Sequence, residues 1–241
     1  MNIALIFAGG IGKRMNTSGI PKQFLKLYGK EIIIYTLEHF ENNKEIDSII
    51  IVCLKEKVNF LEKLIKKYEF NKVKMIVNGG KTGQESIYNG LIAAEKISDS
   101  SDDIILIHDG VRPLINSEII SKNIETVKLM GNCITSAPAI ETIVRLDENS
   151  NIIKDIYKRS ECYMARAPQS FFLKEILDVH KKAIQENKQD FIDSASIMTY
   201  YGHTLNIIVG PSENIKITTP SDFYIFKAIQ DMKESLNILG I

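Results

Sequence analysis

Short apolar runs rich in β-branched residues alternate along this chain with longer amphipathic segments, and this alternation limits the folds that it can adopt. The predicted strands are Ile3–Phe7, Ile49–Cys53, Val73–Val77, Ile104–Ile107, Ile134–Ala137 and Leu205–Val209. The predicted helices are Ile32–Phe40, Val58–Tyr68, Ser86–Ile97, Ser117–Met130, Lys174–Asn187 and a terminal helix that begins near Pro220. Strands separated by helices favour an α/β fold, a mainly parallel twisted sheet with helices on both faces. Such sheets bind ligands at the carboxyl ends of their strands.

One region interrupts the alternation. Between Glu141 and Phe172 the sequence has short alternating stretches, turn residues at 147–151 and no helical pattern. This predicts a β-hairpin arm that leaves the main sheet, within a single domain of residues 1–241. An arm of this length needs a surface to cover it, so we expect a homodimer joined through the arm.

The overall charge and the cysteines exclude several classes of protein. Thirty basic and thirty acidic residues give a net charge near zero, so no global field attracts nucleic acid or an anionic membrane. Any anion site must therefore be local. Cys53, Cys133 and Cys162 are odd in number and form no CxxC pair, which is typical of reduced thiols. Because no apolar run reaches the ~18 residues of a membrane span, and no basic stretch precedes the first strand, we expect a cytoplasmic protein.

A glycine-rich segment, Ala8-Gly9-Gly10-Ile11-Gly12-Lys13-Arg14-Met15, follows the first predicted strand. Its glycines allow sharp turns that bring backbone N–H groups close to a bound anion. The dinucleotide pattern GxGxxG fails because its third glycine would fall on Met15, and the P-loop pattern lacks its first glycine and its Ser or Thr. With Lys13, Arg14 and Lys22 close by, the segment suits a triphosphate. An ordinary βα turn with solvated basic residues is the alternative.

Two further polar clusters follow predicted strands. Asp109, directly after one strand, is well placed to hold Mg²⁺, although a loop-fixing or capping role is the alternative. Its neighbour His108 is expected to be structural, and the role of Arg112 is open. The segment 78–86 opens a helix with small residues that let a flat base lie against the backbone, and Ser86 can offer its hydroxyl. A helix-capping loop is the alternative there.

A third cluster precedes the terminal helix. Lys216 and Thr218 alternate with apolar neighbours on a strand-like segment, so both side chains face the same way and could present a cation and a hydroxyl to phosphate. Capping of the helix by residues 218–222 is the alternative. In the arm, Thr142 and Arg159 are the polar residues best suited to bind a phosphate, and a surface ion pair is the alternative for Arg159.

Seven motifs occur in order: AGGIGKRM, PKQF, NGGKTGQES, HDGVRP, ETIV, APQSF and NIKITTPSD. Together they resemble the family of 2-C-methyl-D-erythritol 4-phosphate cytidylyltransferases and ribitol-5-phosphate cytidylyltransferases, from Ile3 to about Ile229. The resemblance implies a Rossmann-like nucleotidyltransferase domain in a homodimer joined through the projecting arm. It also implies an enzyme that uses CTP and Mg²⁺, transfers CMP to a polyol phosphate and releases pyrophosphate.

Site residues follow from the same resemblance. It implies that Arg14 and Lys22 grip the triphosphate and stabilise the charge that grows on the α-phosphate, with Lys216 assisting. Asp109 falls at the metal position. The residues at the cytidine positions are Ala8, Gly9, Gly80, Lys81 and Ser86, and the phosphate loop adds Gly10 and Gly12.

The acceptor side departs from the family pattern. Thr142 and Arg159 match the positions that receive the acceptor's phosphate, with Thr142 reaching across the dimer. Where the family usually has Thr before Pro-Gln, this chain has Ala167, so a hydroxyl is missing for which Arg166 could compensate. In the base-binding loop, Gly83 stands where an arginine is usual.

Sequence features that differ between the two branches of the family indicate which acceptor this chain uses. The spacer between Met15 and Lys22, the Gly9-Gly10 pair and the segment 218–220 favour the ribitol-phosphate branch, whereas the segment 193–196 is closer to the methylerythritol branch. We therefore predict D-ribitol 5-phosphate as the acceptor, with 2-C-methyl-D-erythritol 4-phosphate as the alternative. A sugar-1-phosphate nucleotidyltransferase and a catalytically silent nucleotide-binding regulator are the rival functions.

Overall fold

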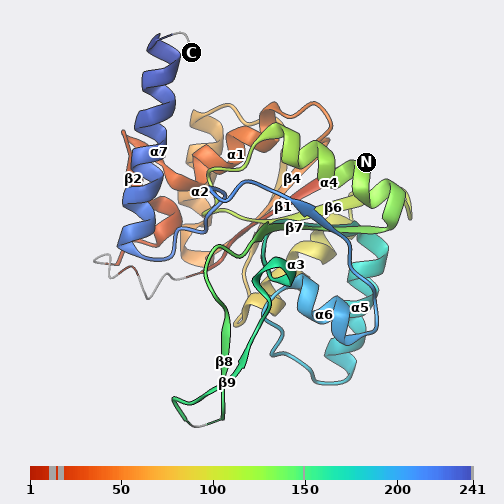
Figure 1. Ribbon diagram of the computed structural model, residues 1–241. Coiled ribbons are helices and arrows are strands. Elements are labelled where there is room, and N and C mark those ends of the chain that lie inside the picture. Colours follow the sequence, from red (N-terminus) through yellow and green to blue (C-terminus); the bar gives the residue numbers. More distant parts are fainter. Residues whose placement is uncertain (11–14, 16–18, 149, 240–241) are drawn as a thin grey trace.

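A seven-stranded mixed sheet forms the centre of the protein, of which the computed structural model describes residues 1–10, 15, 19–148 and 150–239 (Figure 1). In spatial order the strands are β11 (Ile207–Val209), β7 (Asn132–Pro138), β10 (Tyr163–Phe172), β6 (Ile104–Asp109), β1 (Asn2–Ala8), β4 (Ser48–Cys53) and β5 (Val73–Asn78). All neighbours pair in parallel except β10, which is antiparallel to both β6 and β7. The predicted mainly parallel sheet is confirmed.

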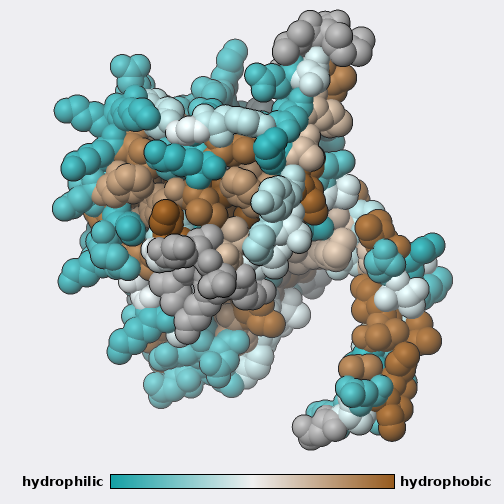
Figure 2. All heavy atoms as spheres, turned by 90° about the vertical axis from the view of Figure 1, so that its left-hand side faces the viewer, coloured by the Kyte–Doolittle hydropathy of each residue, from teal (hydrophilic) through white to brown (hydrophobic). Residues whose placement is uncertain are grey.

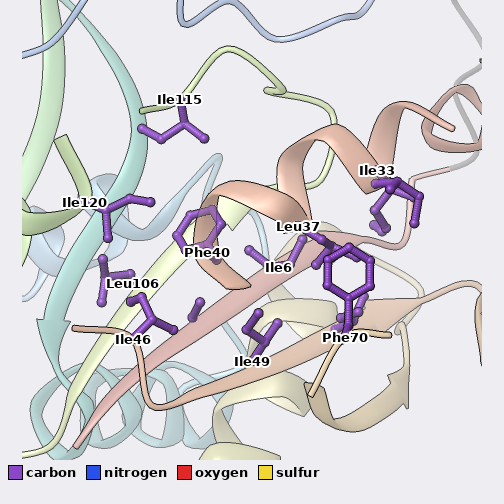
Figure 3. Packing of buried hydrophobic residues seen from close by; sticks show 14 of the residues in the cluster. Ile6, Ile33, Leu37, Phe40, Ile46, Ile49, Phe70, Leu106, Ile115 and Ile120 are labelled. Atoms are coloured by element: carbon purple, nitrogen blue, oxygen red, sulfur yellow. The ribbon is translucent and has the colours of Figure 1, made fainter. Parts of the chain in front are cut away.

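Helices cover both faces of this sheet, as predicted. One face packs against α1 (Ile32–Asn42), α2 (Val58–Lys67) and α4 (Ser117–Met130), and the other against α3 (Gly83–Glu95), α5 (Leu173–Gln185) and α6 (Ser194–Tyr200). In Figure 3, Ile6 and Leu106 of the sheet meet Leu37 and Phe40 of α1 in the first of these cores. Because successive residues of a strand point to opposite faces, Leu5 of β1 belongs to the second core.

The terminal helix α7 (Pro220–Leu239) extends from the body of the protein (Figure 1). Its buried Phe226 packs with Met15, Leu27, Val111 and Ile217, which come from segments outside the main sheet. The short strands β2 (Lys26–Leu27) and β3 (Lys30–Glu31) lie next to this contact. A small separate core therefore anchors the loops that will form the site. Within the described chain, none of the helices combines the length and the apolar character needed to cross a membrane.

A two-stranded antiparallel hairpin, β8 (Val144–Leu146) and β9 (Ile153–Ile156), projects from the body (Figure 1). Its apolar side chains are exposed, for example Ile156 at 66% and Ile152 at 68% (Figure 2). The predicted arm differs from this hairpin at its carboxyl end, because β10 belongs to the main sheet.

The position of β10 has a physical explanation. Pro168 lacks the N–H that a central strand needs, which made a strand within Ala165–Phe172 hard to predict. The structure places it where the pairing of β10 with β7 shifts register, between Ala165 and Gln169. Regular pairing resumes at Gln169, so the proline interrupts the ladder only locally.

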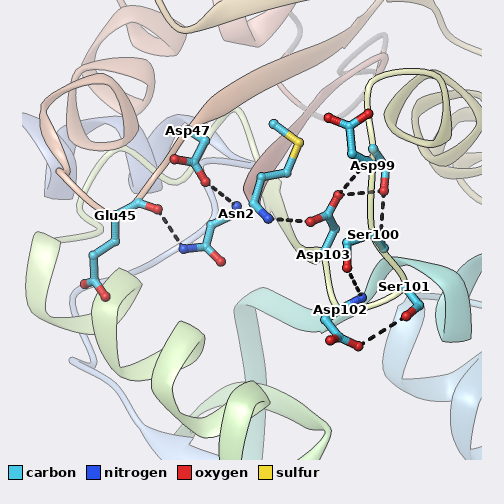
Figure 4. Close-up of polar contacts among 10 residues, drawn as sticks. Asn2, Glu45, Asp47, Asp99, Ser100, Ser101, Asp102 and Asp103 are labelled. Atoms are coloured by element: carbon cyan, nitrogen blue, oxygen red, sulfur yellow. Dashed lines mark hydrogen bonds and ion pairs between the residues drawn. The ribbon is translucent and has the colours of Figure 1, made fainter.

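Polar contacts close the amino edge of the sheet (Figure 4). Asp103, which precedes β6, accepts hydrogen bonds from the Met1 ammonium group, from Ser98 Oγ at 2.7 Å and from the Asp99 backbone at 3.2 Å. Asp47 accepts one from the backbone N–H of Asn2 at 2.6 Å. These contacts fix the start of β1 and β6 in the sheet.

Candidate active site

The carboxyl ends of β1, β5 and β6 meet at one edge of the sheet, and the polar clusters found in the sequence follow these ends. Gly9 and Gly10 come after β1, Gly79 and Gly80 after β5, and Asp109 is the last residue of β6. Parallel strands bring their following loops to the same edge, which explains why segments distant in sequence meet here.

Two glycine loops pack backbone to backbone at this edge. A Cβ atom on Gly9 would lie 3.5 Å from Ser86 Oγ and 3.8 Å from the Cα of Gly79. A Cβ on Gly79 would lie 3.2 Å from the same hydroxyl. Glycine therefore permits the close approach, whereas the position of a Cβ on Gly10 is open space. The structure thus brings Ala8, Gly9 and Ser86 together, as a site for a flat base requires.

Ser86 and Thr82 order the second of these loops. Ser86 Oγ accepts a hydrogen bond from the backbone of Gly80 at 2.9 Å and donates one to the Thr82 carbonyl at 2.8 Å. Thr82 caps α3 by accepting from the backbone of Glu85. Lys81 is exposed, and its backbone N–H donates to the Glu85 carboxylate. The helix-capping alternative accounts for these contacts, and Ser86 Oγ still has acceptor capacity for a ligand.

Gln23 is a site residue that the sequence analysis missed. It lies in the short 3-10 helix η2 (Lys22–Phe24), is 1% exposed and donates from Nε2 to the carbonyls of Ala8 at 2.7 Å and Gly10 at 3.2 Å. The glycine loop is therefore held by a side chain from the PKQF motif. The sequence signal that could have identified Gln23 was its position as a polar residue between Lys22 and Phe24, at the end of a loop.

Asp109 is the centre of a charged cluster. Its carboxylate pairs with Lys216 Nζ at 2.6 Å and with Arg112 Nε at 2.8 Å. Burial raises the pKa of this carboxyl, but attraction to Lys216 and Arg112 and the hydrogen bonds from both outweigh it, so the pKa lies below its usual range. Asp109 is therefore ionised at neutral pH.

Arg112, whose role the sequence left open, connects this cluster to the neighbouring strand. Its Nη1 donates to the carbonyl of Asn214 at 2.8 Å, and Asn214 Nδ2 donates to the carbonyl of Ala167 in β10 at 2.7 Å. The chain from Asp109 through Arg112 and Asn214 to Ala167 fixes the loop before α7 against the sheet. Asn214 is a second residue that the sequence analysis did not single out.

His108 has a structural role, as expected. It is 1% exposed, its ring packs against Phe40 with centroids 5.1 Å apart, and Nε2 lies 3.2 Å from the Arg112 carbonyl. Burial lowers the pKa of His108 to about 3, so the ring is neutral near pH 7.

Asp222, near the start of α7, interacts with both Thr218 and Lys22. Asp222 accepts hydrogen bonds from the backbones of Thr218 at 2.8 Å and Thr219 at 2.7 Å, and attraction to Lys22 helps to lower its pKa against the opposing effect of burial. Thr218 Oγ1 donates to the Lys216 carbonyl at 3.1 Å. The strand-like segment that carries Lys216 and Thr218 joins none of the described sheets, and the capping contacts of Asp222 hold Thr218 and Thr219.

A pocket of ≈ 280 Å³ lies at the same edge. It is lined by Phe7, Gly83, Asp109, Arg112, Ala165–Ala167, Ile192–Ser194 and Lys216, among other residues. Among the titratable side chains in this lining are the cations of Arg112, Arg166 and Lys216 and the carboxylates of Asp109 and Asp193. The pocket therefore suits an anion.

Other predicted residues are not brought to this pocket within one chain. Thr142 and Arg159 are exposed at the base of the arm, where Arg159 Nη1 donates to the Ile140 carbonyl at 3.5 Å. Gly12 and Arg14 lie outside the described residues.

Asp109, which the sequence analysis assigned to a metal, lines this pocket together with the Asp193 carboxylate. In the described part of the chain, no three His, Cys, Asp or Glu side chains are grouped as a metal site. Mg²⁺ commonly takes one or two carboxylates and completes its coordination with substrate phosphates and water, so a single aspartate beside a phosphate pocket fits this ion.

Comparison with known proteins agrees with this geometry. The model of the family IspD, 2-C-methyl-D-erythritol 4-phosphate cytidylyltransferase, matches residues 2–232. Ribitol-5-phosphate cytidylyltransferase of Vibrio parahaemolyticus serotype O3:K6 is 53% identical over 100% of both chains. The 2-C-methyl-D-erythritol 4-phosphate cytidylyltransferase of Clostridium novyi is 41% identical over 95% of this chain and 96% of its own.

A solved structure gives the same result for the fold. The crystal structure of 4-diphosphocytidyl-2C-methyl-D-erythritol synthase from Anaerococcus prevotii superimposes with a TM-score of 0.82 at 25% identity, covering 95% of this chain and 96% of that one. The sheet and the helices that cover it are thus shared. This chain belongs to the 2-C-methyl-D-erythritol 4-phosphate cytidylyltransferase (IspD) family.

Proposed function

We propose that this protein transfers CMP from CTP to D-ribitol 5-phosphate, producing CDP-ribitol and pyrophosphate. The observation that carries the proposal is the cluster of Asp109, Arg112 and Lys216, which lines an anion pocket next to two closely packed glycine loops. The choice of acceptor is supported by the relative named for ribitol 5-phosphate, which is 53% identical, against 41% for the one named for methylerythritol phosphate.

The glycine loops are the proposed nucleotide side of the site. Ala8, Gly9 and Gly80 would hold cytidine through backbone groups, with Ser86 as an acceptor, and Gln23 would keep the first loop in place. Lys81 is exposed beside this loop and would contact the nucleotide from the solvent side. Gly10 and Gly12 would let the loop follow the triphosphate.

The reaction needs charge stabilisation more than a general base. The second pKa of a phosphate monoester is about 6, so the acceptor phosphate is already mostly ionised at neutral pH. One of its oxygens attacks the α-phosphorus of CTP, a new P–O bond forms, and the bond from the α-phosphorus to the bridging oxygen breaks as pyrophosphate leaves. Lys22 and Lys216, together with Arg14, would stabilise the negative charge on the oxygens of the α-phosphate.

Asp109 is the residue that would hold Mg²⁺. Its ionised carboxylate lies at a strand end within the pocket, and the remaining ligands would be phosphate oxygens and water. The ion would neutralise charge on the triphosphate when bound. Arg112 and Lys216, which pair with Asp109 here, keep the carboxylate in its charged form.

A homodimer through the arm would complete the acceptor side. The hairpin exposes apolar side chains, including Val144, Ile153 and Ile156, that a second copy would cover. Thr142 and Arg159 lie at the base of this hairpin and would bind the acceptor's phosphate, with Thr142 contributed across the dimer. Thr218 would support the phosphate from the loop before α7.

We further infer that the protein works in the cytoplasm. The three cysteines are free, and burial raises the pKa of Cys53 to about 11 and of Cys133 to about 12. Such thiols are typical of a reducing compartment. No nucleic acid or membrane partner is needed for this reaction.

An acceptor panel tests the proposal. The protein is incubated with Mg²⁺, CTP and one of D-ribitol 5-phosphate, 2-C-methyl-D-erythritol 4-phosphate or a sugar 1-phosphate, and pyrophosphate release is followed. We expect release with D-ribitol 5-phosphate and CTP in preference to ATP, GTP or UTP. Release only with methylerythritol phosphate would move the protein to the other branch, and CTP binding with no release from any acceptor would indicate a silent regulator.

A further inference from the structure

Two buried polar atoms in the lining residues of the pocket have no protein partner. Arg166 Nε and Ser194 Oγ are both shielded from solvent and accept or donate no hydrogen bond within the described chain. A buried polar group without a partner costs free energy, so it calls for an explanation. The ion pairs that Asp109 forms with Arg112 and Lys216 do not involve these two atoms.

Arg166 is a cation without a counter-ion in the described part of the chain. Arg112 has the Asp109 carboxylate at 2.8 Å, but no ion pair joins Arg166 to an Asp or Glu side chain there. Burial and the positive charge of Arg112 both lower the pKa of Arg166 from its usual value. Two guanidinium groups close enough to repel each other across a pocket would be stabilised by an anion between them.

Ser194 lies in a turn that is held by several hydrogen bonds and that also lines the pocket. It is 2% exposed and is the first residue of α6, which Asp193 caps by accepting from the backbone of Ser196 at 2.8 Å. Gln169 of β10 fixes the same turn, since Nε2 donates to Asp193 at 2.9 Å and Oε1 accepts from the backbone of Ala195 at 2.9 Å. These contacts hold Ser194 in place and leave its own hydroxyl unpaired.

We propose that Arg166 and Ser194 determine acceptor specificity, Arg166 by binding the phosphate of the polyol phosphate and Ser194 by hydrogen bonding to a hydroxyl of its carbon chain. The inference rests on the proposed function. Ala167, the neighbour of Arg166 in β10, carries no polar side-chain group, so Arg166 is the donor that this part of the strand offers. A polyol with a hydroxyl on each carbon can pair with Ser194, whereas a methyl group at the same place cannot.

Steady-state kinetics of Arg166→Met and Ser194→Ala test this assignment. We expect KM for D-ribitol 5-phosphate to rise about 30-fold in Arg166→Met and about 5-fold in Ser194→Ala, as losses of a charged and a neutral hydrogen bond. KM for CTP and kcat at saturating acceptor should stay within about 2-fold. Arg166→Lys should recover part of the loss. Lys174→Met, which removes an exposed cation paired with Asp178 on α5, should leave all parameters unchanged.

Calorimetry with D-ribitol 5-phosphate separates this inference from the proposed function, because binding needs no turnover. Weaker acceptor binding by Arg166→Met, with unchanged CTP binding, supports the assignment even if the wild-type protein releases no pyrophosphate, and that second result would reject only the proposed function. Unchanged acceptor affinity in both variants would overturn the assignment, as would a loss confined to CTP. If Arg166→Met fails to fold, the same measurement on Arg166→Lys and Ser194→Ala decides.

Discussion

The strand β6 has an aspartate at each end, and the two carboxylates have different surroundings. Asp103, just before the strand, is 2% exposed and is surrounded by the Met1 ammonium group, a serine hydroxyl and a backbone N–H. Asp109, the last residue of the strand, pairs with Lys216 and Arg112 and lines a pocket. In both, burial opposes the charged form, the partners outweigh it, and the pKa is lowered.

The difference lies in what surrounds each pair. At the amino edge, the partners of Asp103 include the chain terminus and backbone groups, which belong to the fold, and none of these partners lines the pocket that contains Asp109. At the carboxyl edge, the partners of Asp109 are two side-chain cations, and Arg166 adds a third that pairs with no carboxylate among the described residues. A lowered pKa alone therefore does not identify a functional carboxylate, whereas a lowered pKa within a pocket of excess positive charge does.

Of the variants considered, Lys216→Ala should cause the largest loss of activity at the carboxyl edge. It removes a cation that would stabilise the α-phosphate, and loss of one such contact lowers kcat by about 10²- to 10³-fold. Lys227→Ala is the matched control, because Lys227 pairs with Asp231 on the outer part of α7. Initial rates of pyrophosphate release measure both variants. Turnover within a few-fold of wild type in Lys216→Ala would remove Lys216 from the reaction.

Asp109→Asn should lower kcat by about 10²-fold, since the amide keeps the shape of the side chain but loses the charge that would hold Mg²⁺. Raising the Mg²⁺ concentration should recover part of the rate. The measurement is a magnesium titration of turnover at saturating CTP. An identical magnesium dependence in the variant and the wild type would contradict the metal role of Asp109.

Asp103→Asn should lower the stability of the protein and leave its turnover unchanged, in contrast to Asp109→Asn. It weakens the contacts of a buried carboxylate with Met1 and Ser98, so the free energy of unfolding should fall by about 1–3 kcal/mol. At a temperature where the variant is folded, kcat should equal that of the wild type. Urea unfolding monitored by circular dichroism, with kinetics on the same sample, checks both. A large loss of kcat without a loss of stability would contradict the claim that Asp103 stabilises the fold and Asp109 serves the reaction.

The smallest expected effect is the change with pH in the stability difference between the wild type and Asp103→Asn. The pKa of Asp103 is lower in the folded state, so its contribution to stability is complete above the unfolded pKa of about 3.9 and is lost as pH falls through the folded value. The stability difference between wild type and Asp103→Asn should therefore be constant near pH 7 and narrow below about pH 4. Urea unfolding at a series of pH values measures it, and a difference that widens in acid would have the wrong sign.

Much of the fold was predictable because each strand and helix carries its own hydrophobic pattern. The six predicted strands and six predicted helices all occur, although the predicted strand Leu205–Val209 is shorter, at Ile207–Val209. The strand β10 was not predicted, because Arg166 and Pro168 contradict a central strand and only a local register shift accommodates them. The helix α6 was missed as well. It is short, and its capping box of Asp193 and Ser196 was its main signal.

The site was predictable where a motif follows a strand and less so where a residue acts through tertiary contacts. Asp109 and Lys216 were singled out in the sequence, and the structure joins them across more than a hundred residues. Gln23 supports the glycine loop through carbonyls that no local pattern reveals. The unpaired atoms of Arg166 and Ser194 become visible only in the folded protein, where β10 and the start of α6 line one pocket.

The central claim is that the carboxyl edge joins CTP to the phosphate of a polyol phosphate. Phosphorus NMR of the wild-type protein with Mg²⁺, CTP and D-ribitol 5-phosphate tests it most directly, because the bond made is observed at the atoms that form it. We predict that the phosphomonoester signal of the acceptor is replaced by two coupled diphosphate signals and that free pyrophosphate appears in equal amount. An unchanged phosphomonoester signal, with CTP intact or hydrolysed to CMP, would contradict the account.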